Sequence, residues 1–548
     1  MEGKKYNGGA LVAEVLKKEG VRYVFGIPGG HIYPMMEACA ARGIPFIGVR
    51  HEMNAAFMAE GWALTTGMPG VCTGTAGPGF TNLITGLANS SNGGIPIFCL
   101  AGKARITEND RNELQDFNQM DMIKHITKHC RAVAETHRVP EYVGRALAYC
   151  STGRPGPVYL EIPRDLMDKE VLAADVEFQQ TYRTAAVPAG DPAVVEAAAK
   201  MLQAARKPVI IAGGGVWWSQ AHNELSRLVE KTGIPVFTRN AARGVVPDSH
   251  PLCMGIAASA SPVLRTALAE ADLALVVGTR PGFTMTRDVF PKSLRIIRVD
   301  IDPAQLTDQL DVSIGIVGDA RRVLEQLADF TGGVDCKDWV GYLAGMKNNL
   351  DSMVTAMGAS HQCPIHPLRL VFEIAKRVDE DTIVVTDGGD AAKWGNLALP
   401  VPGPGRHPGI ISTSFGPLGV GIPYAIAAKL AHPDKKVILL TGDGAFGYGA
   451  MEYDTAVRYN LPFTTVILND KCWGMIKRSE AKKSATSEGF VGLDLLETRY
   501  DKLVEILGGH GEYVTQPGYI GPALERALDS GKPACLNVIT DPDIGPMV

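Results

Sequence analysis

Two aspartates in the C-terminal third of the chain are the residues best suited to bind a metal ion. Asp443 lies in the turn Gly442-Asp443-Gly444 after the apolar segment 437–440, and Asp470 follows the apolar segment 463–468. Between them we expect a turn and one helix, from about Tyr448 to Tyr459. A right-handed crossover between parallel strands would then bring both carboxylates to one edge of a sheet. Magnesium binds one or two protein carboxylates and takes phosphate oxygens and water as its other ligands.

The glycines beside Asp443 extend this prediction from a metal ion to a phosphate. Gly442 and Gly444 allow the backbone to approach an anion closely, and the start of the following helix attracts negative charge. A tight strand–helix turn without any ligand would explain a lone Gly-Asp-Gly equally well. The second acidic strand end, at Asp470, favours the ligand site.

A glutamate in the first third of the chain has a similar position. Glu52, in PFIGVRHEMNAA, lies between an apolar strand and a helix that we expect to begin at about Asn54. Its structural explanation is a first-turn carboxylate that complements the helix dipole. Its functional explanation is an acid that faces a ligand.

Short apolar runs that end in a polar or glycine turn recur throughout the chain and predict the elements that hold these residues. They are RYVFGIPGG, PFIGVRHE, GVCTGTAGPG, PIFCLAG, KPVIIAGGG, LALVVGTR, TIVVTDGGD, KVILLTGDG and TTVILND. Runs rich in Val, Ile and Leu are typical of parallel strands buried on both faces. Helix-length segments separate them, which predicts an α/β fold with ligands at the carboxyl ends of the strands.

Two breaks in this pattern divide the chain into three predicted domains, each a doubly wound parallel sheet. The pattern is lost after residues 153–167 and again after a helix that ends near Phe330. The predicted domains are residues 1–172, 188–332 and 362–548, which are ordinary domain sizes.

Composition narrows the class of protein. A net charge of −5 gives no reason to expect nucleic acid as a partner. Ten scattered cysteines without a Cys-x-x-Cys pair indicate neither a zinc cluster nor a disulfide framework. The chain shows no signal peptide and no run of about 18 apolar residues, so we expect a soluble, cytoplasmic protein that makes no membrane contact.

Three sequence motifs resemble those of thiamine-diphosphate enzymes. HE-x-x-A-x-x-x-A-E-G at 51–61, followed by TAGPG-x-T-N, is similar to the pyrimidine-domain signature of that family. GDG with Asn469-Asp470 resembles its diphosphate motif, which usually ends in Asn-Asn, and 412–430 also matches. The similarity is to the branch of acetolactate synthase, benzaldehyde lyase, oxalyl-CoA decarboxylase and 2-hydroxyacyl-CoA lyase. It implies a pyrimidine-binding, a central nucleotide-binding-like and a diphosphate-binding domain.

The resemblance assigns residues to the metal and to the cofactor. Magnesium would be bound by the side chains of Asp443 and Asp470 and by the carbonyl of Cys472. Because most relatives have Asn at position 470, we expect binding to persist with a stronger dependence on magnesium. The implied cofactor-binding residues are Glu52, Gly388, Gly389, Asp390, Gly416, Leu418, Gly442, Asp443, Gly444, Ala445, Asp470, Gly474 and Met475.

The family's chemistry gives Glu52 a specific role. A carboxylic acid hydrogen-bonded to pyrimidine N1′ stabilises the imino tautomer that removes the thiazolium C2 proton, so Glu52 would act as a proton relay. The Gly416 carbonyl would accept from the 4′-amino group. Leu418 would support the two rings, although core packing explains a leucine equally well. Because Glu52 and Asp443 lie in different domains, the family pattern implies a site built from two subunits, hence a homodimer at least and commonly a homotetramer.

The substrate is less determined than the cofactor. His31, in GIPGGHIYP, matches a histidine of benzaldehyde lyase that assists proton transfer, and Gln115 matches an active-site glutamine of the branch. Ser479 replaces a tryptophan with which acetolactate synthase chooses its second keto acid. The C-terminal segment TRYDKLVEILGGHGEYV resembles 2-hydroxyacyl-CoA lyases and oxalyl-CoA decarboxylases. The polar run 477–489 would be a mobile lid or solvated surface.

We therefore expect a lyase or carboligase that acts through an enamine on a 2-keto acid, an aldehyde or a 2-hydroxyacyl compound. The enzyme alternatives are acetolactate synthesis, benzaldehyde-lyase chemistry, and 2-hydroxyacyl-CoA or oxalyl-CoA chemistry with a CoA thioester as substrate. A silent regulatory subunit is the non-enzyme alternative, and the presence of Glu52 and Asp443 argues against it. In the central domain, Gly213-Gly214-Gly215 and VVGTRPGF leave FAD, ADP, a CoA nucleotide or no ligand open.

Overall fold

The computed structural model describes residues 3–401, 413–481 and 491–546. The chain divides into two compact units. The first comprises Met1–Ala185, Ser412–Pro433 and Gly449–Pro462, and the second comprises Ala186–Ile411, Asp434–Tyr448 and Phe463–Val548. Among the described residues, the strands form three parallel sheets and one short antiparallel pair.

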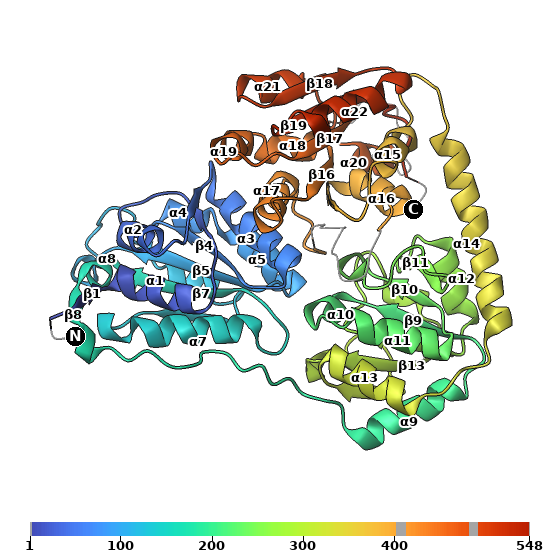
Figure 1. Cartoon of the computed structure of the whole chain (residues 1–548), viewed down its shortest axis with the longest axis horizontal. Helices are drawn as coiled ribbons and strands as arrows, with labels where there is room; N and C mark the ends of the chain where they lie inside the picture. The colour runs from blue at the N-terminus through green and yellow to red at the C-terminus, as the bar shows by residue number, and fades with distance from the viewer. Residues whose placement is uncertain (1–2, 402–412, 482–490, 547–548) are drawn as a thin grey trace. The chain divides into compact units, whose positions relative to one another are not determined.

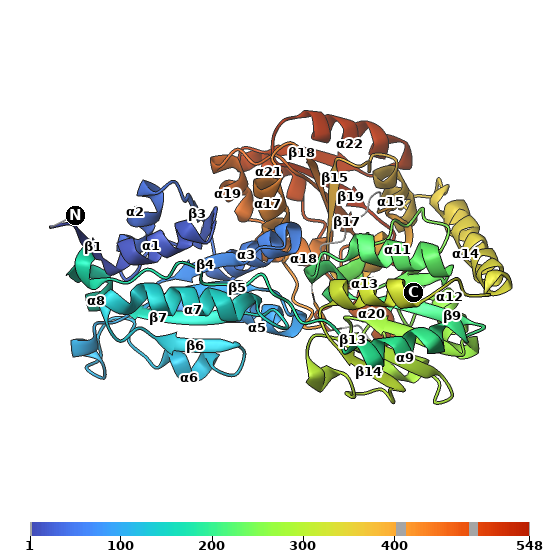
Figure 2. The ribbon, with the colours of Figure 1, turned by 60° about the horizontal axis from the view of Figure 1, so that its bottom comes forward.

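The first unit is built on a parallel sheet (Figure 1). Its strands, in spatial order, are β3 (Phe46–Gly48), β2 (Val24–Gly26), β4 (Gly70–Gly74), β5 (Ile97–Lys103), β7 (Val158–Pro163) and β6 (His129–Ala132). One face is buried by α1 (Gly8–Lys18), α2 (Tyr33–Ala41) and α7 (Val139–Ser151). Figure 2 shows α7 running alongside β5, β6 and β7. Helices α3 (Glu52–Thr66) and α5 (Ile84–Gly93) pack on each other, and α3 packs on β4.

Two helices that lie far along the chain also belong to the first unit. Helix α17 (Gly421–Ala431) packs on α3 and also contacts α19 (Glu452–Arg458). The remaining elements of this unit are β1 (Lys5–Asn7), α4 (Pro78–Thr81), η1 (Ile106–Glu108), α6 (Gln119–Ile123), η2 (Thr136–Arg138), α8 (Arg164–Asp168), β8 (Glu170–Leu172) and η3 (Ala173–Asp175). The antiparallel pairing of β1 with β8 departs from the all-parallel prediction.

The second unit contains the other two sheets. The central sheet has the order β11 (Cys253–Ile256), β10 (Val236–Thr238), β9 (Pro208–Ala212), β12 (Leu273–Val277), β13 (Arg295–Asp300) and β14 (Ile314–Val317). Helices α9 (Pro192–Gln203), α10 (Gly214–Trp218), α11 (His222–Thr232) and α13 (Ala320–Phe330) cover one face. Helices α12 (Pro262–Glu270) and α14 (Lys337–Gly358) cover the other. Short 3-10 turns lie at η4 (Asn240–Ala242), η5 (Arg287–Val289) and η6 (Pro303–Gln305).

The C-terminal sheet carries the two aspartates. Its order is β15 (Thr382–Asp387), β16 (Lys436–Gly442), β17 (Thr464–Asn469), β19 (Ala534–Ile539) and β18 (His510–Val514). Helices α15 (Pro367–Ala375), α16 (Gly389–Ala398) and α22 (Ile520–Asp529) form a core with it. The long helix α14 contributes Trp339 and Leu343 to the central core and Val354 to this one (Figure 1). The other elements are α18 (Asp443–Gly449), α20 (Gly474–Ala481), α21 (Tyr500–Ile506) and η7 (Pro517–Tyr519).

The α/β fold and each of the strand-forming runs are confirmed, but two predicted helix starts are wrong. Helix α18 begins at Asp443 itself, and the helix expected from Tyr448 to Tyr459 is in fact α18 followed by α19. Helix α3 begins at Glu52 rather than Asn54, with His51 as its N-cap. In both cases the acidic side chain occupies the first turn, where the helix dipole stabilises it. The glycines within 442–449 are typical of a turn, which is why the sequence predicts a later helix start than the structure shows.

The three sheets lie within residues 24–163, 208–317 and 382–539. The predicted domain boundaries at 172, 188, 332 and 362 remain a prediction. Among the described residues, no helix is both long and apolar enough to cross a membrane.

Candidate active site

Asp443 and Asp470 lie at the ends of adjacent strands, as the sequence predicts. Strands β16 and β17 pair in parallel with Gly442 opposite Leu468, so the next residues on each strand face one edge. Both aspartates are largely buried. Burial and the neighbouring negative charge of Asp470 raise the pKa of Asp443 to about 7. Burial also raises the pKa of Asp470, against the opposing effect of the Arg478 guanidinium.

The donor atoms at this edge fit a divalent cation. The Oδ1 atom of Asp443 accepts from the N–H of Gly444 at 3.0 Å. Its Oδ2 atom is buried and has no hydrogen-bond partner among the described residues. An orphaned carboxylate oxygen beside a second carboxylate is costly unless a cation compensates it. No group of three or more His, Cys, Asp or Glu side chains in the described ranges is arranged to hold a metal, so backbone, phosphate or water would supply the other ligands.

The predicted cofactor-binding glycines of the second unit lie in one tightly packed cluster. Gly389, Gly444 and Gly474 exclude a side chain because a neighbour occupies the space that a Cβ atom would need. A Cβ at Gly389 would lie 2.3 Å from the Met475 Sδ, and one at Gly444 would lie 2.5 Å from the Trp473 ring. The structure therefore brings together the following predicted residues from β15–α16, β16–α18 and β17–α20: Gly388, Gly389, Asp390, Gly442, Asp443, Gly444, Ala445, Asp470, Cys472, Gly474 and Met475.

An arginine that the sequence reasoning did not single out also reaches this cluster. The Nη2 atom of Arg478, in α20, donates to Oδ2 of Asp390 and lies 3.4 Å from Oδ2 of Asp470. Its Nη1 atom donates to the carbonyl oxygen of Pro542. One signal in the sequence could have pointed to it: an acidic residue at position 470 needs a counter-charge. The polar run 477–489, expected to be a mobile lid or solvated surface, lies from residue 482 onward outside the described residues.

In the first unit, Glu52 is held at the start of α3. It is 8% exposed, and its Oε2 atom accepts from the Nδ2 atom of Asn82 at 2.9 Å. One carboxylate oxygen of Glu52 is therefore hydrogen-bonded to a side-chain amide of the TAGPG-x-T-N segment. Asn82 is the last residue of that motif, and the sequence alone does not indicate this contact with Glu52.

His31 and Gln115, both predicted site residues, meet around Thr75. The His31 Nδ1 atom lies 2.8 Å from the Thr75 Oγ1 atom, and Thr75 Oγ1 lies 3.4 Å from the Gln115 Oε1 atom. Gln115 has a left-handed backbone with φ of 64°, and it packs against Gly77. Burial, assisted by the positive charge of Arg164, lowers the pKa of His31. The imidazole is therefore neutral near pH 7 and can accept as well as donate a proton.

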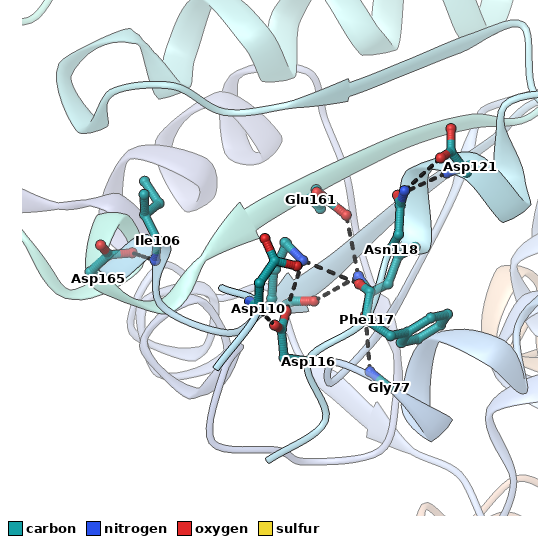
Figure 3. A network of polar contacts seen from close by, with 12 residues as sticks. Gly77, Ile106, Asp110, Asp116, Phe117, Asn118, Asp121, Glu161 and Asp165 are labelled. Atoms are coloured by element: carbon teal, nitrogen blue, oxygen red, sulfur yellow. Dashed lines mark hydrogen bonds and ion pairs between the residues drawn. The ribbon is translucent and has the colours of Figure 1, made fainter. Parts of the chain in front are cut away.

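A buried polar network fixes the segment that carries Gln115 (Figure 3). The Lys103 Nζ atom, at the end of β5, binds Asp116 Oδ1 at 3.1 Å, and Asp116 Oδ2 accepts from the Asp110 N–H. The Gln119 Oε1 atom accepts from the Gly77 N–H at 2.9 Å, while its Nε2 atom donates to Glu161 Oε2. One network therefore ties the 103–119 segment to the Gly77 turn.

The predicted residues Gly416 and Leu418 also belong to the first unit. Gly416 has φ of 73°, and its N–H donates to the Thr413 carbonyl at 3.0 Å. Leu418 is half-buried just before α17. Their roles toward a cofactor remain predictions.

Close packing explains the glycines of the central sheet's turns. A Cβ at Gly213 would lie 2.2 Å from the Cβ of Thr279, and one at Gly215 would lie 2.7 Å from the Cα of Gly278. The Gly213–Gly215 and VVGTRPGF turns, which follow β9 and β12, thus approach closely. Close packing of these turns explains the glycines without a nucleotide.

Comparison with known proteins matches three segments of the chain to one family. Residues 6–122 match the model described as thiamine pyrophosphate enzyme, N-terminal TPP binding domain, residues 195–327 match the central domain, and residues 387–538 match the C-terminal TPP binding domain. The acetolactate synthase large subunit of Mycobacterium tuberculosis is 36% identical over 98% of this chain and 96% of its own length.

Two further relatives span almost the full chain. A probable acetolactate synthase large subunit of Methanocaldococcus jannaschii is 32% identical, covering 98% of this chain and 92% of its own length. The 2-hydroxyacyl-CoA lyase 1 of Mus musculus is 28% identical, covering 98% and 95%. The chain therefore belongs to the thiamine pyrophosphate enzyme family, in the branch that contains acetolactate synthases and 2-hydroxyacyl-CoA lyases.

Proposed function

We propose that this thiamine-diphosphate-dependent enzyme acts as a carboligase of the acetolactate synthase type, joining two molecules of a 2-keto acid with loss of one CO₂. The observation that carries the proposal is the buried Oδ2 atom of Asp443 next to Asp470, which has no hydrogen-bond partner among the described residues. The choice of reaction is supported by relatives named as acetolactate synthases, which are 31–36% identical, compared with 28–29% for those named as 2-hydroxyacyl-CoA lyases.

In this proposal the second unit holds Mg²⁺ and the diphosphate. Asp443, Asp470 and the Cys472 carbonyl are the metal ligands, and the backbone at Gly388, Gly389, Gly442, Gly444 and Ala445 surrounds the phosphates. Hard oxygen ligands and close backbone N–H groups suit this ion and this anion. Asp390 is at the start of α16 and orients Arg478.

The first unit supplies the acid–base groups. Thiamine diphosphate, when bound, supplies a carbon nucleophile at its thiazolium C2. Glu52 holds a proton at pyrimidine N1′, with Asn82 fixing the orientation of its carboxyl group. Gly416 positions the pyrimidine, and Leu418 supports the two rings of the cofactor. His31, neutral and hydrogen-bonded to Thr75, moves a proton at the substrate hydroxyl, and Gln115 orients the substrate.

We further propose that two subunits share each site, so that the enzyme is a homodimer at least, commonly a homotetramer, in the cytoplasm. The support is the family pattern alone, in which the glutamate and the GDG aspartate come from different domains.

A second candidate reaction is the cleavage of a 2-hydroxyacyl compound, including a CoA thioester. A specific observation favours it: His31 is placed beside Thr75 and Gln115, where a neutral imidazole can take the proton of a hydroxyl group.

The test is a product survey by NMR. The magnesium- and cofactor-loaded enzyme is incubated with pyruvate, with benzoin or benzaldehyde, and with formaldehyde plus an acyl-CoA. We expect acetolactate from pyruvate as the fastest product. Acetaldehyde alone would demote the ligase proposal, and a 2-hydroxyacyl-CoA as the only product would replace it with the second candidate.

A further inference from the structure

We infer that Arg478 is the built-in counter-cation of the acidic strand edge, and that it exchanges its carboxylate partners when Mg²⁺ and a diphosphate bind. The inference rests on the proposed function for the identity of these ligands. Arg478 is a positioning residue: it acts on the metal through Asp470, is held by Asp390, and attracts the phosphate by its charge.

The contacts of Arg478 join three segments. Its Nη2 atom donates to Asp390 at the start of α16, and both terminal nitrogens lie 3.4 Å from Oδ2 of Asp470 at the end of β17. The third contact is with the Pro542 carbonyl in the C-terminal segment. The side chains of Arg478, Asp390 and Asp470 are only 18%, 17% and 16% exposed. Solvent therefore screens these charges weakly.

The charge count explains why this chain needs such a group. Asp390, Asp443 and Asp470 place three carboxylates around one strand edge, with Arg478 bridging two of them. Nearby lysines are engaged elsewhere: Lys477 pairs with Asp494, and Lys471 pairs with Glu497. An asparagine at position 470 would need no counter-charge. The acidic residue at 470 and Arg478 therefore form one functional pair.

Opposite effects on a cation and on an anion follow from this arrangement. Arg478 competes with Mg²⁺ for Asp470 and repels it, so removal of the guanidinium should strengthen the binding of the metal alone. The same guanidinium attracts phosphate oxygens, so its removal should weaken the binding of a diphosphate. A residue that only maintained the fold would weaken both.

The experiment is calorimetric titration of the full-length, EDTA-stripped protein with Mg²⁺ alone, and then with pyrophosphate in the presence of saturating Mg²⁺. For Arg478→Gln we expect Mg²⁺ affinity to rise about fivefold and pyrophosphate affinity to fall about tenfold, the scale of one partly screened charge. Asp470→Asn should weaken Mg²⁺ binding about tenfold, and in that background Arg478→Gln should change Mg²⁺ affinity less than twofold. Arg478→Lys, which keeps the charge, should retain wild-type Mg²⁺ affinity within about twofold.

The matched control is Lys477→Gln, which removes one positive charge from the same helix, away from the two aspartates. It should leave both affinities within twofold of wild type. Equal loss of both ligands in Arg478→Gln, or an equal gain in Lys477→Gln, would overturn the inference. If the single variant does not fold, the comparison of Asp470→Asn with the double variant decides. Failure of wild-type protein to bind Mg²⁺ and pyrophosphate would instead contradict the proposed function.

Discussion

Two buried carboxylates with raised pKa values have opposite surroundings. Glu60, in the middle of α3, is 0% exposed, and burial raises its pKa to about 8. Asp443 is 2% exposed, and burial with the charge of Asp470 raises its pKa to about 7. Both oxygens of Glu60 accept hydrogen bonds, from Asn89, Ser90 and Tyr424. One oxygen of Asp443 accepts none from the described residues.

This difference shows that a raised pKa alone does not mark a functional site. Glu60 is matched by donors from α3's own neighbours, α5 and α17, and holds helices together. In the part of the chain that the structure describes, no donor reaches one oxygen of Asp443, and a second carboxylate lies nearby. The unsatisfied acceptor, rather than the pKa, identifies the ligand site.

The largest effect should come from Asp443. In Asp443→Ala we expect turnover to fall about 1,000-fold, because the site loses a ligand of the metal ion that holds the cofactor in position. The apo form of Asp443→Asn should be more stable than wild type by about 1 kcal/mol at pH 8, because a buried carboxylate beside Asp470 is removed. Steady-state kinetics and urea unfolding measure the two quantities. An active Asp443→Ala variant, together with an Asp443→Asn variant that is less stable than wild type, would erase the contrast with Glu60.

Glu60 should control the pH dependence of stability. Its folded-state pKa of about 8 lies above the ordinary value of 4.5, so between these pH values the folded state alone holds the proton. Stability is therefore lost as the pH rises from about 4.5 to about 8. Across this window the free energy of unfolding of the wild type should fall by on the order of 3 kcal/mol more than that of Glu60→Gln. Chemical denaturation at several pH values tests this, and parallel curves would contradict it.

Glu52 should affect chemistry with little effect on folding. Glu52→Gln keeps the shape of the side chain and its contact with Asn82 but removes the transferable proton. We expect kcat to fall about 100-fold, within the range for loss of an acid–base group, with a melting temperature within about 2 °C of wild type. A turnover close to wild type would rule out the proton-relay role.

The smallest effect should come from the network that anchors Gln115. Asp116→Asn weakens the ion pair with Lys103, which is partly buried. We expect KM for the keto acid to rise about fivefold with kcat nearly unchanged, equivalent to roughly 1 kcal/mol for a partly screened pair. Lys124→Gln, which breaks an exposed pair with Asp121 in the same region, is the control. If both variants behave alike, the network does not position Gln115.

Much of the fold and part of the site could be predicted from the sequence for a clear physical reason. Buried parallel strands require continuous apolar runs, and polar turns at their ends must meet at one edge, so Asp443 and Asp470 were placed correctly. Helix starts were less predictable, because glycines at 444, 447 and 449 resemble a turn although the dipole and the carboxylate of Asp443 allow a helix.

Long-range polar contacts could not be predicted in this way. Glu60 lies in an apolar helical stretch, and its partner Tyr424 lies more than 300 positions away along the chain. Arg478 belongs to a polar run that resembles solvated surface, and only the fold reveals that it reaches Asp390. Such pairings depend on packing between distant elements rather than on local periodicity.

The most direct test of the central claim is to count bound Mn²⁺, a spectroscopic substitute for Mg²⁺, by electron paramagnetic resonance in the presence of thiamine diphosphate. Wild-type protein should bind one ion per chain, and Asp443→Ala should bind none at equimolar Mn²⁺. Equal binding by both proteins would show that the Oδ2 atom of Asp443 is not the metal ligand.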